Sequence, residues 1–514
     1  MCGILFSSKQ IDDLCSILKF LKKRGPDHTE YKIINDYHFV HVLLSMTGIN
    51  YTVQPFVYDE NIIIMFNGEI YNYKQFGDFN SDGECIIECY KQYGDDFVKH
   101  LDGEFALLLV DFSKDLLYYS TDVFSTKPLW YANDDADIGL CSYESSLKYL
   151  GFKNVKQIDA NTTIKLKLST REILLKQTVY DFDLRQHKTT FDDWNTAFEN
   201  AILKRTNNVK HKIFIGLSAG YDSGLISCIL NKLNIDYTAY SIIGSEDINL
   251  INKRHDLLKN GYILDLLQED FLQQHEFLKE YGEEYFLNID TGEMEQCDKL
   301  NNQINVCTDT NEKDKLILQL NMLKKKLHEN LVQHKISSDN GAIGMSYICS
   351  LAKSNNQLIY LSGSGADEII SDYGFNKVKH YTHSTIGGYF PEILESVFPW
   401  KNFFGNTQRA YLMKEEIVSG TWGIEGRYPF LDKQVVQEFL WLTNDIKNSV
   451  YKSVIHNYFI RNDYPFTINE KIGFNCGFTG VNNGFIKKDV HNLNVDKTPV
   501  GVAKNGRLDL IVKL

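Results

Sequence analysis

The sequence lacks the features of membrane, secreted and nucleic-acid-binding proteins. Basic residues are in the minority, with 54 Lys and Arg against 67 Asp and Glu. The resulting net charge of −13 argues against a nucleic-acid or anionic-membrane partner. No apolar run approaches the roughly 20 residues that a membrane span needs, and residues 1–6 lack the basic and apolar segments of a signal peptide. The ten cysteines are scattered, which in so long a chain indicates a reducing, cytoplasmic compartment.

Simple metal and dinucleotide motifs are missing as well. No G-x-G-x-x-G fingerprint with a trailing acidic residue occurs. Cys85 with Cys89, and His380 with His383, are too few to make a metal site. The 514 residues, of which 43% are hydrophobic and 24% charged, predict a globular protein of two or three domains.

The most informative stretch is a small-residue loop at residues 217–224, which reads Leu-Ser-Ala-Gly-Tyr-Asp-Ser-Gly. An apolar run at 213–217 predicts a strand before it, and residues 225–230 predict a helix after it. A strand, a tight loop and a helix N-terminus together present backbone N–H groups to a phosphate. The loop is not a Walker motif, because no G-x-x-x-x-G-K-[ST] occurs there. Taken alone, the octet fits a phosphate site and an ordinary turn about equally well.

Cys2 can supply a nucleophile and a base in one residue. It is small enough for Met1 to be removed, which would free its α-amino group. With a pKa of about 7.7–8.0, that amine can act as general base for the adjacent thiol. A cysteine at this position is usually only an early buried residue, so a catalytic role needs support from other motifs. Such motifs occur at residues 24–27 (Arg-Gly-Pro-Asp), 67–72 (Asn-Gly-Glu-Ile-Tyr-Asn), 82, 103–106 and 127–129.

In order and spacing, these motifs resemble the N-terminal-nucleophile glutaminase domain of class II amidotransferases, here residues 1–185. Alternating strands and turns with two helices, one of them at 10–23, predict a layered sheet sandwich there. The resemblance implies an αββα fold and hydrolysis of glutamine to glutamate and ammonia. The resemblance implies that Cys2 is the nucleophile. It also implies that Asn67 and the Gly68 N–H form the oxyanion hole, and that Glu69 and Asp82 bind glutamine.

One position departs from that glutaminase pattern. An arginine that grips the α-carboxylate of glutamine normally stands where this sequence has Leu43, and no arginine is nearby. Losing a charge-assisted hydrogen bond costs roughly 1.5–3 kcal/mol. We therefore expect weakened or rearranged glutamine binding. Because Cys2, Asn67 and Asp82 are present, we expect an active but altered glutaminase.

Residues 181–190 are polar and predict a linker. An amphipathic helix from 191 to about 204, the strand before the octet, and a further strand at 238–243 predict a parallel α/β sheet. The octet resembles the pyrophosphate loop of ATP-pyrophosphatases. This resemblance implies pyrophosphate binding by Leu217, Ser218, Gly220 and Ser223, and a carboxylate for Mg²⁺, a cation that prefers oxygen ligands, from Asp222. Ala219, where glycine is usual, requires a negative φ.

Two further motifs follow in the second half. Residues 362–368 read Ser-Gly-Ser-Gly-Ala-Asp-Glu after a predicted strand at 357–361, and the carboxyl ends of such strands are where open α/β sheets bind ligands. Residues 422–432 carry Glu-Gly-Arg-Tyr-Pro-Phe-Leu-Asp. With the octet, these resemble the synthetase domain of the asparagine synthetase family. The resemblance implies ATP and pyrophosphate contacts from Ser362, Gly363, Asp367 and Lys452, which we place in a helix, with Asp367 sharing Mg²⁺ with Asp222.

The synthetase motif also has a departure. The family has a glutamate, linked to ammonia attack or substrate handling, where this chain has Ser364, and serine cannot act as a carboxylate base. Glu368 is near in sequence, but its side chain cannot be assumed to replace it. We place the synthetase domain at residues 190–490, with a helical insertion at about 290–335 and a C-terminal tail at 491–514.

The resemblance as a whole implies a two-domain α/β amidotransferase that uses glutamine, ATP and Mg²⁺. Ammonia would pass internally to an acid activated as its adenylate, with release of pyrophosphate and then AMP. Aspartate is the leading acid, giving asparagine, and another carboxylate such as a sugar uronic acid is the close alternative. An ammonia-only synthetase and a catalytically degraded binding or regulatory relative also remain open. We expect a cytoplasmic protein without nucleic-acid or membrane partners, and a homodimer is possible.

Overall fold

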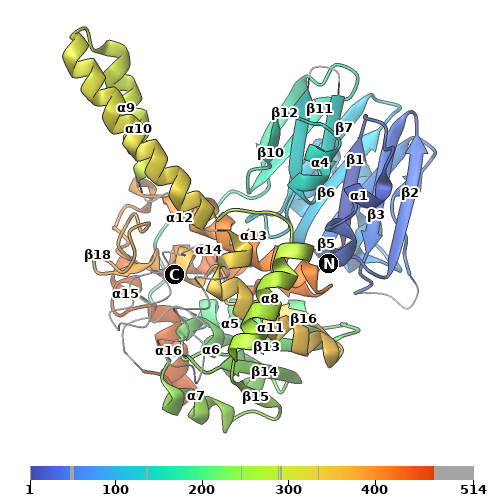
Figure 1. Cartoon of the computed structure of the whole chain (residues 1–514). Coiled ribbons are helices and arrows are strands. Elements are labelled where there is room, and N and C mark those ends of the chain that lie inside the picture. The colour runs from blue at the N-terminus through green and yellow to red at the C-terminus, as the bar shows by residue number, and fades with distance from the viewer. Residues whose placement is uncertain are drawn as a thin grey trace.

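The computed structural model describes residues 2–46, 51–134, 137–244, 246–287, 289, 292–333 and 335–467. The part before residue 180 forms two six-stranded antiparallel sheets, and the later part contains a five-stranded parallel sheet (Figure 1). This confirms the mixed α/β fold that the sequence predicted. The antiparallel sheets come first in the chain and the parallel sheet later. None of the described helices is long and apolar enough to cross a bilayer.

The two antiparallel sheets pack face to face. The first has the order β10-β8-β9-β1-β3-β2 and the second β12-β11-β7-β6-β5-β4. The strands of the first are β1 Gly3–Ser7, β2 His28–Ile34, β3 Tyr37–Leu43, β8 Trp130–Asp134, β9 Asp137–Cys141 and β10 Val155–Gln157. Those of the second are β4 Phe56–Tyr58, β5 Ile62–Ile70, β6 Gly103–Asp111, β7 Leu116–Thr121, β11 Thr162–Lys167 and β12 Ile173–Thr178.

Strand β1 shows why the central strands are apolar on both faces. Ile4 and Phe6 join Ile63 and Met65 of β5 in one buried cluster between the sheets, whereas Leu5 belongs to the main hydrophobic core. Successive side chains of a strand point to opposite faces, so a strand covered on both sides buries every residue. Short helices complete this half: α1 Leu14–Ile17, α2 Leu21–Arg24, α3 Cys85–Tyr93 and α4 Glu144–Tyr149.

The single helix predicted over 10–23 is wrong. The Asp13 side chain accepts a hydrogen bond from the Ser16 N–H at 3.1 Å, so the first helix starts only at Leu14. It ends after one turn, and a second short helix begins at Leu21. The turn between them brings Arg24 into the interior of the protein, where it is fully buried.

The parallel sheet has the order β15-β14-β13-β16-β19. Its strands are β13 Lys212–Gly216, β14 Tyr237–Ile242, β15 Gly261–Leu264, β16 Gln357–Leu361 and β19 Glu425–Arg427. The longer helices of this half are α5 Asp192–Thr206, α6 Tyr221–Lys232, α7 Ile248–His255, α8 Gln268–Tyr281, α11 Asn340–Ser354, α13 Thr407–Thr421, α14 Lys433–Trp441 and α16 Ser453–Arg461. Shorter elements are α12 Lys401–Phe404, α15 Asn444–Lys447, β17 Gly374–Phe375 and β18 Val378–Lys379.

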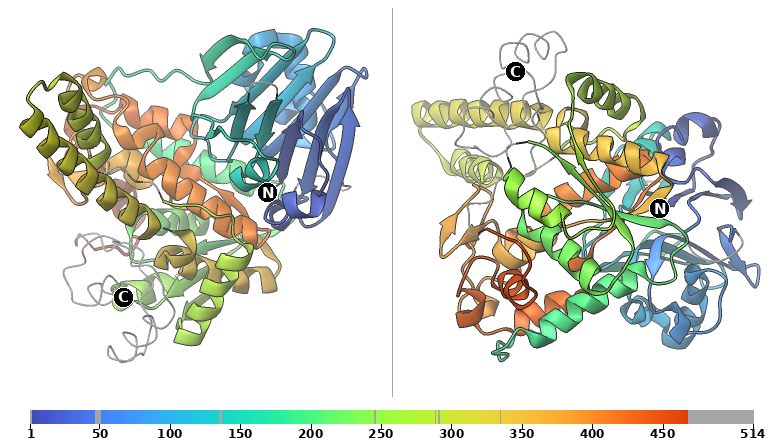
Figure 2. Two further views of the ribbon diagram at one scale, coloured as in Figure 1. Left: turned by 45° about the horizontal axis from the view of Figure 1, so that its top comes forward. Right: turned by 90° about the horizontal axis from the view of Figure 1, so that it is seen from below.

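Two helices extend away from the body of the molecule. These are α9 Glu293–Val306 and α10 Thr310–Gln333, which pack on each other as a hairpin on the side away from the antiparallel sheets (Figures 1 and 2). They cover the segment where the sequence predicted a helical insertion. The tail predicted at 491–514 lies outside the described residues.

Candidate active sites

Cys2 immediately precedes β1 and lies beside the loop that follows β3. Its backbone N–H donates to Asn67 Oδ1 at 3.0 Å, and its Sγ lies 3.7 Å from the Leu44 carbonyl oxygen. Burial raises the pKa of the Cys2 thiol to about 11. The sulfur is therefore a neutral thiol at pH 7, and it needs a base before it can attack a carbonyl carbon.

Asn67 and Gly68, both in β5, present hydrogen-bond donors next to Cys2. The Asn67 side chain is fully buried, and its Nδ2 meets no acceptor among the described residues. Gly68 has a φ of +135°, and a Cβ there would lie 1.9 Å from the Glu104 carbonyl oxygen, so only glycine fits. An oxyanion hole requires a hydrogen-bond donor beside the nucleophile that is not used by an acceptor within the protein. The Asn67 amide meets this requirement.

Acidic side chains surround a single guanidinium on the other side of this site. Arg427 NH2 lies 3.4 Å from Glu69 Oε2 and 2.7 Å from Glu425 Oε1. Burial and then Glu425 raise the pKa of Glu69 well above its usual value, and burial raises that of Asp82 to about 6. Burial would also raise the pKa of Glu425, but Arg427 and Lys127 help to lower it to about 2. Such a cluster suits an incoming ammonium group, which would stabilise the ionised carboxylates.

Leu43 ends β3 and is 7% exposed. A cation from the later half of the chain reaches the same edge, because Lys210 Nζ lies 2.9 Å from the Ser45 hydroxyl oxygen. The sequence did not suggest Lys210, since 165 residues separate the two. A lysine therefore contacts Ser45, two residues beyond Leu43, the position at which the resemblance implies an arginine.

The octet forms the predicted loop between β13 and α6. Ser218 Oγ lies 2.9 Å from Ser223 Oγ, and the N–H groups of Ser218 and Gly220 donate to these hydroxyls at 3.0 and 3.1 Å. Leu217 is buried, and its N–H donates to the Tyr240 carbonyl at 2.8 Å. Ala219 is not among the residues with positive φ, which meets the condition for alanine there.

Two residues that the sequence did not indicate hold this loop. Arg254, at the end of α7, is fully buried and donates through NH1 to the carbonyls of Ser218 at 2.5 Å and Gly220 at 2.7 Å. A Cβ at Gly224 would lie 2.7 Å from this guanidinium, which explains the glycine. Glu246 accepts a hydrogen bond from the Ala219 N–H at 2.6 Å, and burial raises the pKa of Glu246 to about 7.

The structure brings Asp222 and Asp367 together through Lys452. Lys452 Nζ pairs with Asp222 and lies 2.7 Å from Asp367 Oδ1. Lys452 does not lie within a helix as expected; it is the N-cap of α16, with a φ of +47°. Burial alone would lower the pKa of Lys452, but Asp222 and its other neighbours raise it above the usual value. The lysine is therefore charged and pairs with both carboxylates.

The two carboxylates fit a magnesium ion that is shared with phosphate. Mg²⁺ prefers oxygen ligands and is commonly held by one or two carboxylates together with substrate phosphates. In the part of the chain that the structure describes, no group of three or more His, Cys, Asp or Glu side chains could form a metal site.

The second loop, after β16, lies against the first. A Cβ at Gly363 would lie 3.0 Å from the Asp222 Cβ, so the lack of a side chain at Gly363 permits this contact. Ser362 Oγ and Ser364 Oγ both donate to the carboxylate of Glu415 in α13, at 2.5 and 2.8 Å. Glu415 had no signal in the sequence, because it lies 51 residues beyond Ser364.

A buried ionic cluster connects the two halves. Arg24 Nε donates to the Cys2 carbonyl at 3.0 Å, and Arg24 NH2 lies 2.9 Å from Glu416 Oε2. The other oxygen of Glu416 accepts hydrogen bonds from Lys127 Nζ and Tyr428 Oη, each at 2.9 Å. Residues from three of the sequence motifs thus meet on one carboxylate of α13, beside Cys2.

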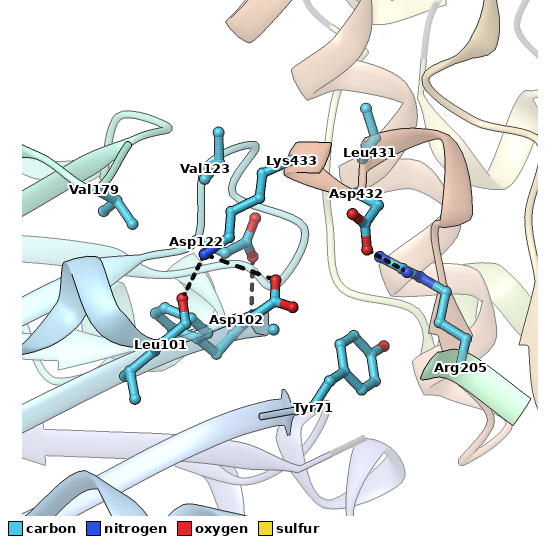
Figure 3. A pocket seen from close by; sticks show the side chains of 12 residues that line it. Tyr71, Leu101, Asp102, Asp122, Val123, Val179, Arg205, Leu431, Asp432 and Lys433 are labelled. Carbon is cyan, nitrogen blue, oxygen red and sulfur yellow. Dashed lines mark hydrogen bonds and ion pairs between the residues drawn. The ribbon is translucent and has the colours of Figure 1, made fainter. Parts of the chain in front are cut away.

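A pocket also lies between the two halves (Figure 3). Lys433 donates to the Leu101 carbonyl at 3.0 Å, and Arg205 NH1 lies 3.1 Å from Asp432 Oδ2. The lining residues are Tyr71, Leu101, Asp102, Gly103, Phe105, Asp122, Val123, Val179, Arg205, Leu431, Asp432 and Lys433. Neither Cys2 nor Asp222 is among them.

Comparison with known proteins finds similar sequences over most of the chain. Residues 1–185 match the family model described as a glutamine amidotransferase domain. A putative glutamine-hydrolysing asparagine synthetase of Methanocaldococcus jannaschii is 24% identical over 502 residues, covering 87% of this chain and 81% of that protein. The glutamine-hydrolysing asparagine synthetase of Mus musculus is 25% identical over 553 residues, covering 95% and 86%. The chain is therefore similar to these synthetases over most of its length.

A shorter match has a higher sequence identity. Glutamine-hydrolysing asparagine synthetase 2 of Bacillus subtilis is 34% identical over 117 residues, covering 21% of this chain and 16% of that protein. A solved B. subtilis glutamine phosphoribosylpyrophosphate amidotransferase aligns at 11% identity with a TM-score of 0.29, covering 51% of this chain and 81% of that one. That superposition is too poor to say anything about this chain.

Proposed function

We propose that this chain, similar over most of its length to glutamine-hydrolysing asparagine synthetases, makes asparagine from aspartate with glutamine as nitrogen donor and ATP as energy source. The observation that carries the proposal is the pair of sites in one chain, Cys2 with an unpartnered amide donor on one side and Asp222, Lys452 and Asp367 on the other. The first site suits amide hydrolysis and the second suits a polyphosphate.

Residues 1–185 would act as an αββα N-terminal-nucleophile glutaminase. Once Met1 is removed, the α-amino group of Cys2 takes the thiol proton, and the sulfur attacks the amide carbon of glutamine. Asn67 Nδ2 and the Gly68 N–H would stabilise the oxyanion that forms. Glu69 and Asp82 would hold the substrate's ammonium group, which explains why carboxylates gather there.

Residues 190–490 would act as an ATP-pyrophosphatase-type synthetase domain. The loop N–H and hydroxyl groups of both motifs would contact the phosphates, through Leu217, Ser218, Gly220, Ser223, Ser362 and Gly363. Asp222 and Asp367 would hold Mg²⁺, which, when bound, neutralises phosphate charge. Lys452 would then turn from the carboxylates to the phosphates as a further cation.

The acid's carboxylate attacks the α-phosphate of ATP, and pyrophosphate leaves. This step is needed because a free carboxylate does not react with ammonia, whereas AMP is a good leaving group. Ammonia released at Cys2 would travel inside the protein. The buried cluster at Glu416 supports this route, since α13 contacts both sites.

The test is pyrophosphate release with ATP, Mg²⁺, glutamine and each candidate acid. We expect release with aspartate, together with asparagine formation. If pyrophosphate is not released with millimolar aspartate but is released with a sugar uronic acid, the substrate assignment is wrong and the proposed mechanism still holds. A protein that hydrolyses neither glutamine nor ATP with any acid would be a binding or regulatory relative instead.

A further inference from the structure

Glu415 lies between the two proposed sites. It faces the loop after β16, where Ser364 Oγ donates to its Oε1 and Ser362 Oγ to its Oε2. The next residue in the same helix, Glu416, faces the other way and pairs with Arg24, which contacts the Cys2 carbonyl. One helical step in α13 therefore separates a carboxylate at the loop after β16 from a carboxylate beside Cys2.

The loop after β16 contacts both Asp222 and Glu415. Gly363 packs against Asp222, while its two serine neighbours point their hydroxyls at Glu415. The Ser364 N–H also donates to the Ser362 hydroxyl at 3.0 Å, so the whole turn is fixed around the carboxylate. An acid held at this loop would have the phosphate-binding residues on one side and Glu415 on the other.

A second carboxylate, Glu368, belongs to the same sequence motif, but both of its oxygens accept hydrogen bonds from within the protein. Its oxygens accept hydrogen bonds from the Tyr373 hydroxyl at 2.5 Å and the Gly365 N–H at 3.1 Å, and the side chain is 2% exposed. Gly365 has a φ of +96°, so this contact supports a tight turn. Glu415, in contrast, is only partly buried as a residue.

The surroundings of Glu415 favour a carboxylate that can accept a proton. Burial raises the pKa of Glu415 above its usual value, and the two serine hydroxyls oppose the shift. The titratable groups that face it are Lys414 and Glu416 on its own helix, Cys349 from α11, Tyr360 from β16 and Tyr428. A raised pKa brings the carboxylate closer to neutral pH, where a general base works best.

We propose that Glu415, oriented by Ser362 and Ser364, is the proton acceptor for the attack of ammonia on the activated acid. The proposal rests on the proposed function and adds a residue to it. The nitrogen lone pair forms a bond to the acyl carbon, and the acyl carbon–oxygen bond to AMP breaks with its electron pair leaving on the AMP oxygen. The surplus proton on nitrogen passes to the Glu415 carboxylate. The products are the amide and AMP.

The experiment separates this step from adenylation. Glu415→Gln keeps the size of the side chain and removes its basicity. For this variant, acid-dependent ATP–pyrophosphate exchange and glutaminase activity should stay within about threefold of wild type. Amide formation from saturating ammonia should fall roughly 10²- to 10⁴-fold, the usual contribution of a general base. Glu276→Gln in α8, whose side chain is 59% exposed, is the matched control and should behave like wild type.

The pH dependence adds a readout that a purely structural role would not affect. At constant free ammonia, wild-type amide formation should fall as the pH is lowered through the Glu415 pKa, and Glu415→Gln should lose this limb. Three results would each overturn the proposal. Glu415→Gln could form the amide at the wild-type rate, it could keep the fall in amide formation at low pH, or it could lose ATP–pyrophosphate exchange as strongly as amide formation. If Glu415→Gln does not fold, Ser364→Ala decides: about tenfold slower amide formation with exchange retained supports it, and no change overturns it.

Failure of the two proposals is distinguishable. If wild-type protein shows no pyrophosphate exchange with any acid, the proposed function fails, and the role of Glu415 fails with it. If wild-type protein makes the amide and Glu415→Gln matches it, only the role of Glu415 fails.

Discussion

The guanidinium of Arg24 lies 2.9 Å from the carboxylate of Glu416, although 392 residues separate them in sequence. Both side chains are almost completely buried, and Arg24 also holds the Cys2 carbonyl. This pair joins the antiparallel half to the parallel half at the candidate nucleophile. The geometry of Cys2 therefore depends on how the two halves pack.

Arg24→Met should destabilise the protein. Removing one partner of a buried ion pair costs roughly 3–5 kcal/mol, because the other charge stays buried. Glu416 keeps Lys127 and Tyr428, so we expect a loss near the lower end, together with reduced glutaminase activity. Urea unfolding measures the first effect and glutamate release the second. Lys91→Met, which removes only an exposed ion pair, should cost less than about 1 kcal/mol. Equal stability of the two variants would contradict the role given to this pair.

Cys2→Ala should abolish glutamine-dependent amide formation and leave ammonia-dependent formation intact. The reason is that Cys2 acts only in the release of ammonia. The measurement is asparagine formation with glutamine and with ammonium as alternative donors. Cys15→Ala, which changes an exposed cysteine, should retain both activities. Unchanged activity of Cys2→Ala with glutamine would point to a synthetase that uses free ammonia only.

Asp222→Asn and Asp367→Asn should each reduce ATP–pyrophosphate exchange by roughly 100-fold or more, because each removes a charge aimed at the magnesium–phosphate site. Glutaminase activity should persist, since neither carboxylate contacts Cys2. Exchange should also need Mg²⁺ and stop when the ion is removed with a chelator. Asp236→Asn, at an exposed position, is the control. Full exchange activity in Asp222→Asn would rule out this placement of the phosphate site.

Glu283 should make stability fall as the pH rises. It accepts hydrogen bonds from the Ser145 N–H at 2.8 Å and from the Ser145 hydroxyl, and burial raises the pKa of Glu283 from 4.5 to about 7. The folded protein binds this proton more tightly than the unfolded chain. The resulting stabilisation is complete below about pH 4.5 and is lost as the pH rises to about 7.

Glu283→Gln should therefore be more stable than wild type at pH 8, by on the order of 3 kcal/mol at most. At pH 5 the two proteins should differ much less. Urea unfolding at both pH values measures the effect. Glu284→Gln, at a side chain that is 63% exposed, should show no such pH dependence. A wild-type protein that is more stable than Glu283→Gln at pH 8 would reverse the sign assigned here.

Sequence reasoning succeeded where the chemistry is local. The octet from Leu217 was predicted with its flanking strand and helix, and the loop from Ser362 was predicted with the strand before it. It failed over residues 10–23, where one helix was expected and Asp13 instead starts a short helix at Leu14. Lys452 was placed in a helix, whereas it caps one with a positive φ.

By itself, the sequence determined the strand–loop–helix units, the candidate nucleophile Cys2 and the two acidic loops, because each depends on neighbouring residues. Only the tertiary structure decided that Lys452 bridges Asp222 and Asp367, that Arg254 donates hydrogen bonds to the loop from Leu217, and that Glu415 faces Ser364. In sequence, a glutamate or arginine on a helix is indistinguishable from a solvated charge. Burial and a partner far along the chain give such a residue its role, and both arise only when the two halves pack together.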